Sequence, residues 1–578
     1  MQAVRAFTSA VPTAPDVAET LRRGLGVTRT FARILQARGH DDVARTARFL
    51  DPRLADLTSP AAMADREATT DRLASAIRRR ERIVIFGDYD VDGITSAAVM
   101  TSAIRALGGE AVPILASRFD GGYGFSQRAL ERVRALSPGL VVTCDCGSSD
   151  HERLAQLRAA GIDAIVIDHH LVPSEVLPAF AFLNPHRPEC GFPFKHLASC
   201  GLALSIAAAL RTRLGVALDL RPLLDLVALG TVADVAPLVG DNRALVRAGL
   251  QRIATSPRPG IEALAELAGM SAGVAVSGED IAFKFAPRIN APGRLGSPDV
   301  ALELLLETDL VRARALAARL EQDCVSRREI ERRIVGEATA QIEALGLQRA
   351  PGIVVAAQGW HVGVVGIVAA RLVDAFHVPV VVVALEGDEG RGSVRGPAGS
   401  RLHDALTAAR AGLLGFGGHQ AAAGVHVAAS SVERFRELFQ QACADAAPAP
   451  IGDPNDESDV RAVRVGPIAD ATLDPLDEPG ALVVDLERLE PCGEGNRAPL
   501  LRVLDAEVLS VRIMKEEHLR LVVRHGGRLL DGFGYSLAQK APERGARIDL
   551  VGRLKRDTYR GRGAVELRVT SVSTRSGE

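Results

Sequence analysis

Between residues 82 and 231 the chain alternates short apolar runs with longer segments that have helical spacing. The apolar runs are 82–86, 112–116, 140–144 and 164–167, and helical spacing is found at 94–107, 197–214 and 222–231. Short β-branched runs that alternate with helices are typical of βαβ units, which build a parallel sheet with right-handed crossovers. This part of the chain is therefore predicted to form an α/β domain.

Acidic and histidine residues stand where three of the predicted strands end. They are Asp88, Asp90 and Asp92 after the first strand, Asp145 after the third, and Asp168, His169 and His170 after the fourth. Asp234 follows the helical segment 226–229. Because the carboxyl ends of parallel strands meet at one edge of a sheet, these side chains are expected to converge. Carboxylates this close repel one another unless a cation lies among them, so the pattern predicts a metal site.

Two other interpretations of residues 88–92 are weaker. An acidic turn alone is often only a solvated loop, but this does not explain the matching residues after two further strands. The spacing also resembles an EF-hand calcium loop, which needs a Glu at its twelfth position and a preceding helix. Here the twelfth residue is Val99 and a strand precedes the turn, so the EF-hand interpretation fails.

The ligand types indicate which ions and which chemistry the site suits. Aspartate oxygens and histidine nitrogens without thiolates favour Mn²⁺ or Mg²⁺ over structural zinc. A carboxylate between the others, such as Asp145, could bridge two ions. Two ions about 3.5–4 Å apart activate a water molecule and stabilise the leaving oxygen in phosphoryl transfer. The sequence therefore predicts a phosphoesterase with two divalent metal ions, Mn²⁺ or Mg²⁺.

A second α/β unit is predicted at 350–445. Strands are expected at 352–356 and 378–384, followed by a glycine-rich turn at 390–396 and a glycine-rich segment at 415–419. Glycine lets a backbone approach phosphate closely, and Ser393, Arg395 and His419 in these segments can bind phosphate oxygens. The preceding segment, 299–345, is long, highly charged and helical in pattern.

The two ends of the chain differ in pattern. Residues 1–79 are polar and are predicted to form a helical lead-in, with short helices at 28–35 and 42–50. After a linker at 447–454, short strands are predicted at 481–486, 500–511, 518–523, 528–533, 547–554 and 564–572. Several short strands in succession predict a small barrel. Its candidate nucleic-acid contacts are Arg512, Lys515, His518, Arg520 and Tyr559.

Composition narrows the class of protein without identifying it. The chain has 578 residues, 47% hydrophobic and 24% charged, with a net charge of −2, which fits a multidomain globular protein. Nucleic acid would therefore have to be bound by local basic patches, and 4% aromatic residues argue against an extensive stacking platform. Seven cysteines without paired spacing, no leader pattern and no apolar run of membrane-spanning length predict a cytoplasmic protein without membrane association.

Four ordered motifs make the chain resemble the DHH phosphoesterase superfamily. They are GDYDVDG at 87–93, DCG at 145–147, DHH at 168–170 and GTVAD at 230–234. Within this superfamily the chain is similar to the RecJ family of bacterial single-strand-specific 5′→3′ exonucleases. The resemblance implies an α/β fold with two α/β domains, a DHH parallel-sheet domain and a DHH-associated domain, joined by a long helix and followed by a C-terminal OB-fold β-barrel. The implied boundaries are 1–79 for the lead-in, 80–298 for the DHH domain, 299–347 for the connecting helix, 348–450 for the DHH-associated domain and 455–578 for the OB-fold nucleic-acid-binding domain.

The resemblance also implies a role for each motif residue. The metal ligands would be Asp90, Asp92, Asp145, His169 and Asp234, with Asp145 between the two ions. The catalytic residues would be His170, which contacts the substrate phosphate, and Asp88 and Asp168, which orient the ligands. The substrate-binding residues would be Arg288, Asn290 and Arg294 along the DNA path and Ser393, Arg395 and His419 on the phosphates, with Ser393 and Arg395 holding the 5′-terminal phosphate. Phe86 stands where some members of the superfamily carry a histidine ligand.

These roles imply a metal-dependent exonuclease that degrades single-stranded DNA from its 5′ end to mononucleotides in DNA recombination and repair. Its partner would be single-stranded DNA with a 5′ end, and a helicase and a single-strand-binding protein are candidate protein partners. Two alternatives stay open. One is a small-substrate DHH hydrolase of oligonucleotides or nucleotides, which usually lacks the barrel. The other is a non-catalytic DNA-binding scaffold, which Phe86 keeps under consideration.

Overall fold

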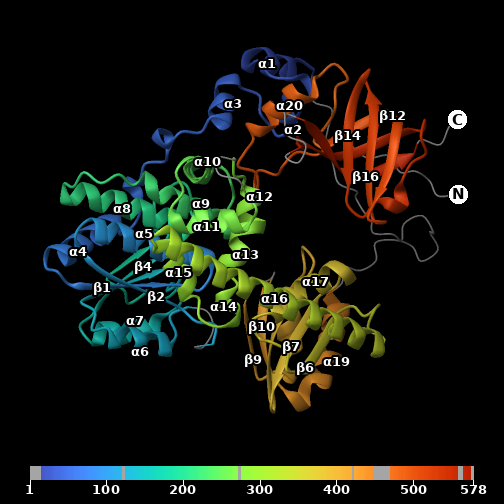
Figure 1. The fold of residues 1–578 in the computed structure, drawn as a ribbon. Helices are drawn as coiled ribbons and strands as arrows, with labels where there is room; N and C mark the ends of the chain where they lie inside the picture. The colour runs from blue at the N-terminus through green and yellow to red at the C-terminus, as the bar shows by residue number, and fades with distance from the viewer. Residues whose placement is uncertain are drawn as a thin grey trace.

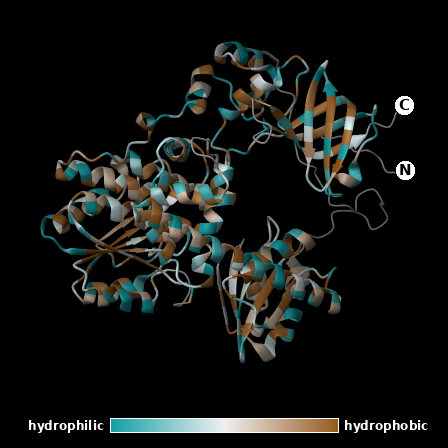
Figure 2. Cartoon of the chain, in the orientation of Figure 1, coloured by the Kyte–Doolittle hydropathy of each residue, from teal (hydrophilic) through white to brown (hydrophobic). Residues whose placement is uncertain are grey.

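The computed structural model describes residues 15–119, 124–270, 275–418, 422–446, 469–557 and 564–574. His419 and Tyr559, two predicted DNA contacts, lie outside these residues. Figure 1 shows two α/β domains and, at the C-terminal end of the chain, a barrel with the N-terminal helices beside it. In Figure 2 the strands of the sheets are mostly hydrophobic, whereas the helices carry both hydrophobic and hydrophilic residues. The fold class predicted from the sequence is confirmed.

The first α/β domain is built on a parallel sheet. Its strands are β1 (Arg82–Gly87), β2 (Glu110–Leu115), β3 (Leu140–Cys144), β4 (Asp163–Ile167) and β5 (Ala181–Leu183), in the order β2-β1-β3-β4-β5. Helices α4 (Arg66–Arg78), α5 (Val91–Ala106) and α8 (Ser199–Leu214) pack on one face, and α6 (Gln127–Ala135) and α7 (His151–Ala159) on the other. Because both faces are covered, the central strands are continuous apolar runs. The four strands predicted here are confirmed.

A layer of helices completes this domain. It contains η3 (Arg221–Leu223), α9 (Leu224–Ala233), α10 (Gly240–Thr255), α11 (Pro259–Leu267), α12 (Gly278–Asp280), the π-helix η4 (Ile281–Phe285), α13 (Ala286–Ile289), α14 (Pro292–Leu295) and α15 (Asp299–Leu306). The long helix α16 (Leu310–Ala344) then leads to the second domain (Figure 1). The helical pattern over 299–345 is thus broken between α15 and α16, because Asp309 accepts a 2.8 Å hydrogen bond from the Arg312 amide and starts a new helix. Within the described part of the chain, no helix is both long enough and apolar enough to cross a membrane.

The second α/β domain has a mixed sheet. Its strands are β6 (Ile353–Gln358), β7 (Val380–Glu386), β8 (Glu389–Arg395), β9 (Gly415–Gly418) and β10 (Ala422–Ala428), in the order β6-β7-β8-β10-β9 with only β6 and β7 parallel. Helices α16 and α17 (Val365–Phe376) cover one face, and α18 (Leu402–Ala408) and α19 (Val432–Ala446) cover the other, with η5 (Arg410–Gly412) and η6 (Ala429–Ser431) between elements. The prediction of a turn at 390–396 is wrong, because these residues form β8. A Cβ on Gly390 or Gly392 would lie 2.7 or 2.8 Å from the Val383 side chain of β7, so these glycines permit close strand packing.

The C-terminal barrel follows the predicted strands with one exception. Its strands are β11 (Ala471–Thr472), β12 (Leu501–Met514), β13 (His518–His525), β14 (Arg528–Gly534), β15 (Arg547–Arg556) and β16 (Val565–Thr574), with η7 (Ala538–Lys540) between β14 and β15. The order is β11-β12-β13-β14-β16-β15, and β12 also pairs with β15 and closes the barrel. The strand predicted at 481–486 is wrong, because these residues lie in helix α20 (Pro479–Glu487). Glu478 starts that helix by accepting hydrogen bonds from two backbone amides, with Pro479 at its first position.

The N-terminal helices pack against the barrel rather than preceding the first domain as a separate lead-in. They are α1 (Pro15–Leu25), α2 (Arg29–Ala37) and α3 (Val43–Leu50), followed by η1 (Leu54–Asp56) and η2 (Pro60–Ala62). Phe31 and Leu50 lie in one hydrophobic core with Leu482 and Val503. The Thr28 amide and hydroxyl donate to Asp485 of α20 at 2.7 and 2.8 Å. Nothing in the sequence pattern predicts this union of the two ends of the chain.

Candidate metal centre and nucleic-acid interface

The predicted carboxylates and histidines converge at the carboxyl edge of the first sheet. Asp88 follows β1, Asp145 follows β3 and Asp168 follows β4. The turns that carry them are tight, since Asp145 has a φ of 63° and a Cβ on Gly93 would lie 2.6 Å from the Asp88 backbone. The glycine that ends the first motif is therefore needed for close approach of two backbone segments.

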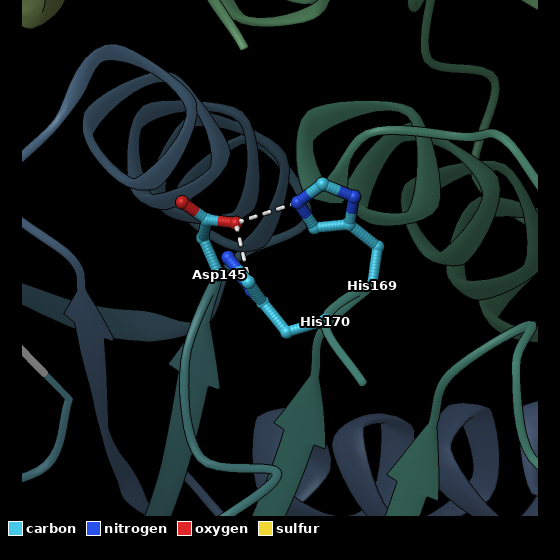
Figure 3. A group of neighbouring side chains, drawn as sticks. All are labelled: Asp145, His169 and His170. Atoms are coloured by element: carbon cyan, nitrogen blue, oxygen red, sulfur yellow. Dashed lines mark ion pairs between the residues drawn. The ribbon is translucent and has the colours of Figure 1, made fainter. Parts of the chain in front are cut away.

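The ligand atoms of these residues form three overlapping groups, and within each group all lie within 4.8 Å of one another. The groups are Asp145, His169 and His170; Asp92, His169 and Asp234; and Asp88, Asp90 and Asp145. Figure 3 shows Asp145 between two imidazoles, with its Oδ1 3.2 Å from His169 Nε2 and 3.8 Å from His170 Nδ1. Asp145 and His169 each belong to two groups, an arrangement that suits two neighbouring cation positions with a shared carboxylate.

The start of helix α8 holds two of these carboxylates in place. Asp92 accepts hydrogen bonds from the Ser199 amide at 2.7 Å and the Cys200 amide at 3.0 Å. Asp145 accepts a hydrogen bond of 3.1 Å from the Ser199 hydroxyl. A Cβ on Gly230 would lie 2.7 Å from Asp92 Oδ1. The glycine of the GTVAD motif therefore leaves room for this carboxylate beside α9. Asp92 and Asp145 are thus oriented by an element that none of the four motifs contains.

Asp168 and His170 form an ion pair at the edge of the group. Asp168 Oδ1 accepts hydrogen bonds from His170 Nδ1 at 2.8 Å and from the His169 amide at 2.8 Å, and Oδ2 accepts one from the Ser148 amide at 3.1 Å. Burial alone would lower the pKa of His170, but the hydrogen bond and charge of Asp168 raise the pKa to about 9. The same contacts outweigh burial and lower the pKa of Asp168. The ion pair with Asp168 therefore favours the protonated form of His170.

Other carboxylates of the cluster are buried close to one another, which raises their pKa values. Neither oxygen of Asp88 has a hydrogen-bond partner among the described residues, and the same holds for His169 Nε2. Burial, with repulsion from Asp90, raises the pKa of Asp88, and burial with repulsion from Asp92 raises that of Asp145. The same two causes, burial and Asp92, raise the pKa of Asp234 to about 8. Buried carboxylates that repel one another at one point are what a site for divalent cations requires.

Phe86 takes no part in this group. Its ring is fully buried in the apolar layer against α6 and α7, where its centroid lies 4.9 Å from that of Phe125. The side chain at this position therefore completes a core. Asp88, two residues further along, belongs to the group with Asp90 and Asp145.

Cationic side chains from both α/β domains lie near one another, and one of them, Arg118, is close enough to Asp88 for its charge to oppose the rise in the pKa of that carboxylate. On β8, Arg395 Nη1 donates a 2.8 Å hydrogen bond to Ser393 Oγ. A Cβ on Gly366, near the start of α17, would lie 3.1 Å from Ser393 Oγ and 3.4 Å from Arg395 Nη2. Ser393 and Arg395 therefore stand beside the N-terminus of a twelve-residue helix, a position that favours anions.

Arg118 and Arg294 extend this positive region into the first domain. The Arg118 guanidinium lies 4.0 Å from the centre of the Tyr89 ring, and its Nε is buried without a hydrogen-bond partner in the described structure. Burial, with the charges of Arg118 and Arg327, lowers the pKa of Arg294 to about 10. Burial and Arg118 also lower the pKa of Arg395. Neighbouring arginines that repel one another favour an anion among them.

Comparison with known proteins identifies the family. Three family models match the chain: the DHH family, N-terminal domain at 82–231, the DHHA1 domain at 350–445 and the RecJ OB domain at 469–571. The single-stranded-DNA-specific exonuclease RecJ of Bacillus subtilis is 33% identical over 564 residues, which cover 96% of this chain and 70% of that protein. The chain belongs to the RecJ family. The RecJ exonuclease of Dickeya dadantii is 38% identical over 524 residues, covering 86% of this chain and 88% of that protein.

Two solved RecJ structures share the fold over 99% of this chain. RecJ from Thermus thermophilus in complex with Mn²⁺ has a TM-score of 0.79 and 30% identity, covering 99% of this chain and 79% of that one. The same protein in complex with Mg²⁺ has a TM-score of 0.73 and 28% identity, covering 99% of this chain and 78% of that one. The resemblance drawn from the four motifs is confirmed.

Arg288 and Asn290, two of the predicted substrate-binding residues, form hydrogen bonds within the protein. Arg288 forms an ion pair with Glu321 of α16 and donates a 2.7 Å hydrogen bond to the Lys284 carbonyl, so its guanidinium is occupied within the protein. Asn290 follows α13, and its backbone amide donates a hydrogen bond of 2.9 Å to the Ala286 carbonyl. Arg294, in contrast, lies in the arginine cluster.

Arg118 is a candidate that the sequence prediction missed. It follows β2 at the same sheet edge as the acidic motifs, and this position was the available signal.

Proposed function

We propose that this chain is a metal-dependent exonuclease that hydrolyses single-stranded DNA from its 5′ end to mononucleotides. The observation that carries the proposal is the meeting of two opposite charge clusters, one of carboxylates at the first sheet and one of arginines that includes β8 of the second. The curated relatives are named single-stranded-DNA-specific exonucleases, in agreement with this proposal. DNA recombination and repair are the processes that this activity would serve.

Asp90, Asp92, Asp145, His169 and Asp234 would hold the two ions, Mn²⁺ or Mg²⁺, with Asp145 shared between them. The two unpartnered oxygens of Asp88 support it as a further ligand or as an acceptor for bound water. Bound divalent ions supply the positive charge that activates water and neutralises the leaving oxygen in phosphoryl transfer. Ser199 keeps the Asp92 and Asp145 carboxylates oriented. His170, charged and held by Asp168, would donate a hydrogen bond to an oxygen of the scissile phosphate.

Selection of the 5′ end would come from the second domain. Ser393 and Arg395, beside the start of α17, would bind the 5′-terminal phosphate with Arg118 opposite them. A terminal phosphate held there fixes which phosphodiester reaches the acidic cluster. Contacts to phosphate fix the position of a strand but do not depend on its base sequence, which suits a nuclease without sequence preference.

The barrel would guide the rest of the strand. Aromatic rings of His518 on β13, Phe533 on β14 and Tyr535 just after β14 lie next to one another, with centroids 4.8–6.0 Å apart. The Arg568 guanidinium lies 5.0 Å from the Phe533 centroid and 5.4 Å from the Tyr535 centroid. Such a surface can stack bases without reading their sequence. A helicase and a single-strand-binding protein as partners stay a prediction.

A cleavage assay with Mn²⁺ tests the proposal. The substrates are a 5′-phosphorylated single strand, the same strand with a blocked 5′ end, and blunt duplex. We expect mononucleotides from the open single strand only, and no product when EDTA removes the ions. Binding without cleavage in Mn²⁺ and Mg²⁺ would favour the scaffold alternative. Equal cleavage of the blocked strand would contradict the role given to Ser393 and Arg395.

A further inference from the structure

The two ends of the chain form one body that is separate in sequence from the catalytic domain. Helices α1–α3, α20 and the barrel share a single hydrophobic core, and we call this body the barrel module. Arg29 and Thr30 of α2 donate their backbone amides to Asp477 at 3.1 and 2.7 Å, and Arg38 forms a 2.8 Å ion pair with Asp470. The module therefore attaches to the first domain as a unit.

Arg243 of helix α10 lies at the centre of this attachment. Its side chain donates to four carbonyl oxygens of the module: Phe49 at 2.8 Å, Leu489 at 2.7 Å, Arg488 at 3.0 Å and Pro491 at 3.2 Å. Its guanidinium also lies 4.3 Å from the centre of the Phe49 ring. Arg243 is only 1% exposed, although its side chain is long and charged. It belongs to the first α/β domain, whereas the carbonyl groups that it contacts belong to the barrel module. One buried side chain thus joins both ends of the chain to the catalytic domain.

The electrostatics explain how a buried cation is tolerated there. Phe49 is in the last turn of α3, and Arg488 and Leu489 follow the last turn of α20, so Arg243 faces the negative C-terminal ends of two helices. Burial lowers the pKa of Arg243 to about 10, which leaves it charged at neutral pH. Only a planar guanidinium offers five donors in a fixed fork, whereas a lysine offers one compact ammonium group.

The segment that carries Arg243 begins at the metal centre. Asp234 ends α9, and the next residues contact the module: the Leu238 amide donates to the Glu494 carbonyl at 2.7 Å. Asn242 holds the turn by donating to the Pro237 carbonyl at 3.1 Å. The ten-residue segment 234–243 therefore contains both a carboxylate of the metal cluster and the anchor of the module.

We propose that Arg243 is a positioning residue for degradation of long strands: it fixes the barrel module at one place relative to the metal centre. The proposal rests on the proposed exonuclease function. A strand bound at the barrel reaches the metal centre with a high effective concentration only if the two sites keep a geometry that one strand can span. Freeing the module would lose that advantage while leaving the metal cluster intact.

The test compares Arg243→Met with the natural protein on two substrates. One is a single strand of about 30 nucleotides, and the other has about three, fewer than the ~4–16 nucleotides that one OB fold covers. We expect the KM for the long strand to rise about tenfold or more in the variant. On the short substrate, kcat and KM should both stay within about twofold, because no barrel contact contributes to its binding.

A matched control and a second variant complete the design. Arg221→Met removes an exposed arginine of the same domain whose ion pair is with Asp219, and it should leave both substrates unaffected. Arg243→Lys keeps the charge but not the fork, so the long-strand KM should rise in the same direction by a smaller factor. This variant replaces Arg243→Met if the latter does not fold. Small-angle scattering should show a larger maximum dimension for the folded variants.

The outcomes separate this proposal from the proposed function. An equal loss of rate on both substrates, or no change in KM for the long strand in a folded variant, would overturn the positioning role. If the natural protein cleaves neither substrate with Mn²⁺, the exonuclease function fails. In that case, an unchanged affinity of Arg243→Met for the uncleaved long strand, measured by fluorescence anisotropy, would overturn the positioning role as well.

Discussion

The two α/β domains place functional side chains on their sheets in opposite ways. In the first domain all strands are parallel, and most of the carboxylates lie just beyond strand ends, while Asp234 follows helix α9. In the second domain Ser393 and Arg395 lie within an antiparallel strand, two residues apart and therefore on the same face of the sheet. The first arrangement gathers anions from several strands at one point, whereas the second displays a hydroxyl group and a cation along one strand beside a helix N-terminus. The difference matches the two tasks proposed, which are holding cations and holding a phosphate.

Asp145→Asn is the strongest test of the first arrangement. Asp145 belongs to two of the three ligand groups, so the substitution removes negative charge from both cation positions. We expect kcat on a 5′-phosphorylated strand to fall about 10³-fold or more, measured by mononucleotide release with Mn²⁺.

Asp163→Asn serves as the matched control for Asp145→Asn. Asp163 is at the opposite, amino-terminal end of β4 and pairs with Arg72 at 2.7 Å, so its loss should leave the rate within about twofold. A normal rate for Asp145→Asn would contradict the shared-carboxylate assignment.

Arg395→Met tests the second arrangement. It removes a cation that would bind the 5′-terminal phosphate, while the acidic cluster stays intact. Hydrogen bonds to charged groups contribute about 1.5–3 kcal/mol, so the KM for a 5′-phosphorylated strand should rise about tenfold to a hundredfold.

The control strand for Arg395→Met carries a 5′-hydroxyl, and its KM should change little. Arg401→Met, which removes an exposed arginine paired with Asp404, is the matched control variant. If both strands lose affinity equally, Arg395 does not select the terminal phosphate.

The two domains also differ in how much of their structure local sequence patterns predict. The first sheet was predictable because each motif is local: an apolar run, a tight turn and a polar residue lie together in the chain. Strand β8 was predicted as a turn because Gly390 and Gly392 suggest one, while its pairing with β7 and β10 is long-range. Helix α20 was predicted as a strand because residues 481–486 are rich in Val and Leu, whereas the cap at Glu478 decides the conformation. The pairing of Arg288 with Glu321, 33 residues away, likewise has no local signal.

Gly363→Ala tests whether activity needs the close contact between the first and second α/β domains. A Cβ at this position would lie 1.9 Å from the Arg294 carbonyl oxygen, so the second domain would have to move away from the first. A shift of a fraction of an ångström between reacting groups lowers rates substantially, and we expect kcat/KM to fall about tenfold.

Gly415→Ala, in β9 of the same domain, is the control for Gly363→Ala. Its Cβ would meet no heavy atom within 4 Å among the described residues, and kcat/KM should be unchanged. Full activity of Gly363→Ala would mean that the contact between the two domains is not required.

The smallest effect is expected in α16, which connects the two sheets. Gly336 lies in this helix with open space where a Cβ would be, so Gly336→Ala should stabilise the protein by about 0.5–1 kcal/mol because alanine favours helix. Gly346, just beyond the same helix, has a φ of 66°, so Gly346→Ala should destabilise it by about 1 kcal/mol. Urea unfolding of the two variants should shift in opposite directions, with kcat on a single strand unchanged in both. If Gly336→Ala lowers kcat, activity depends on flexibility within α16, and the two sheets do not face each other in one fixed arrangement.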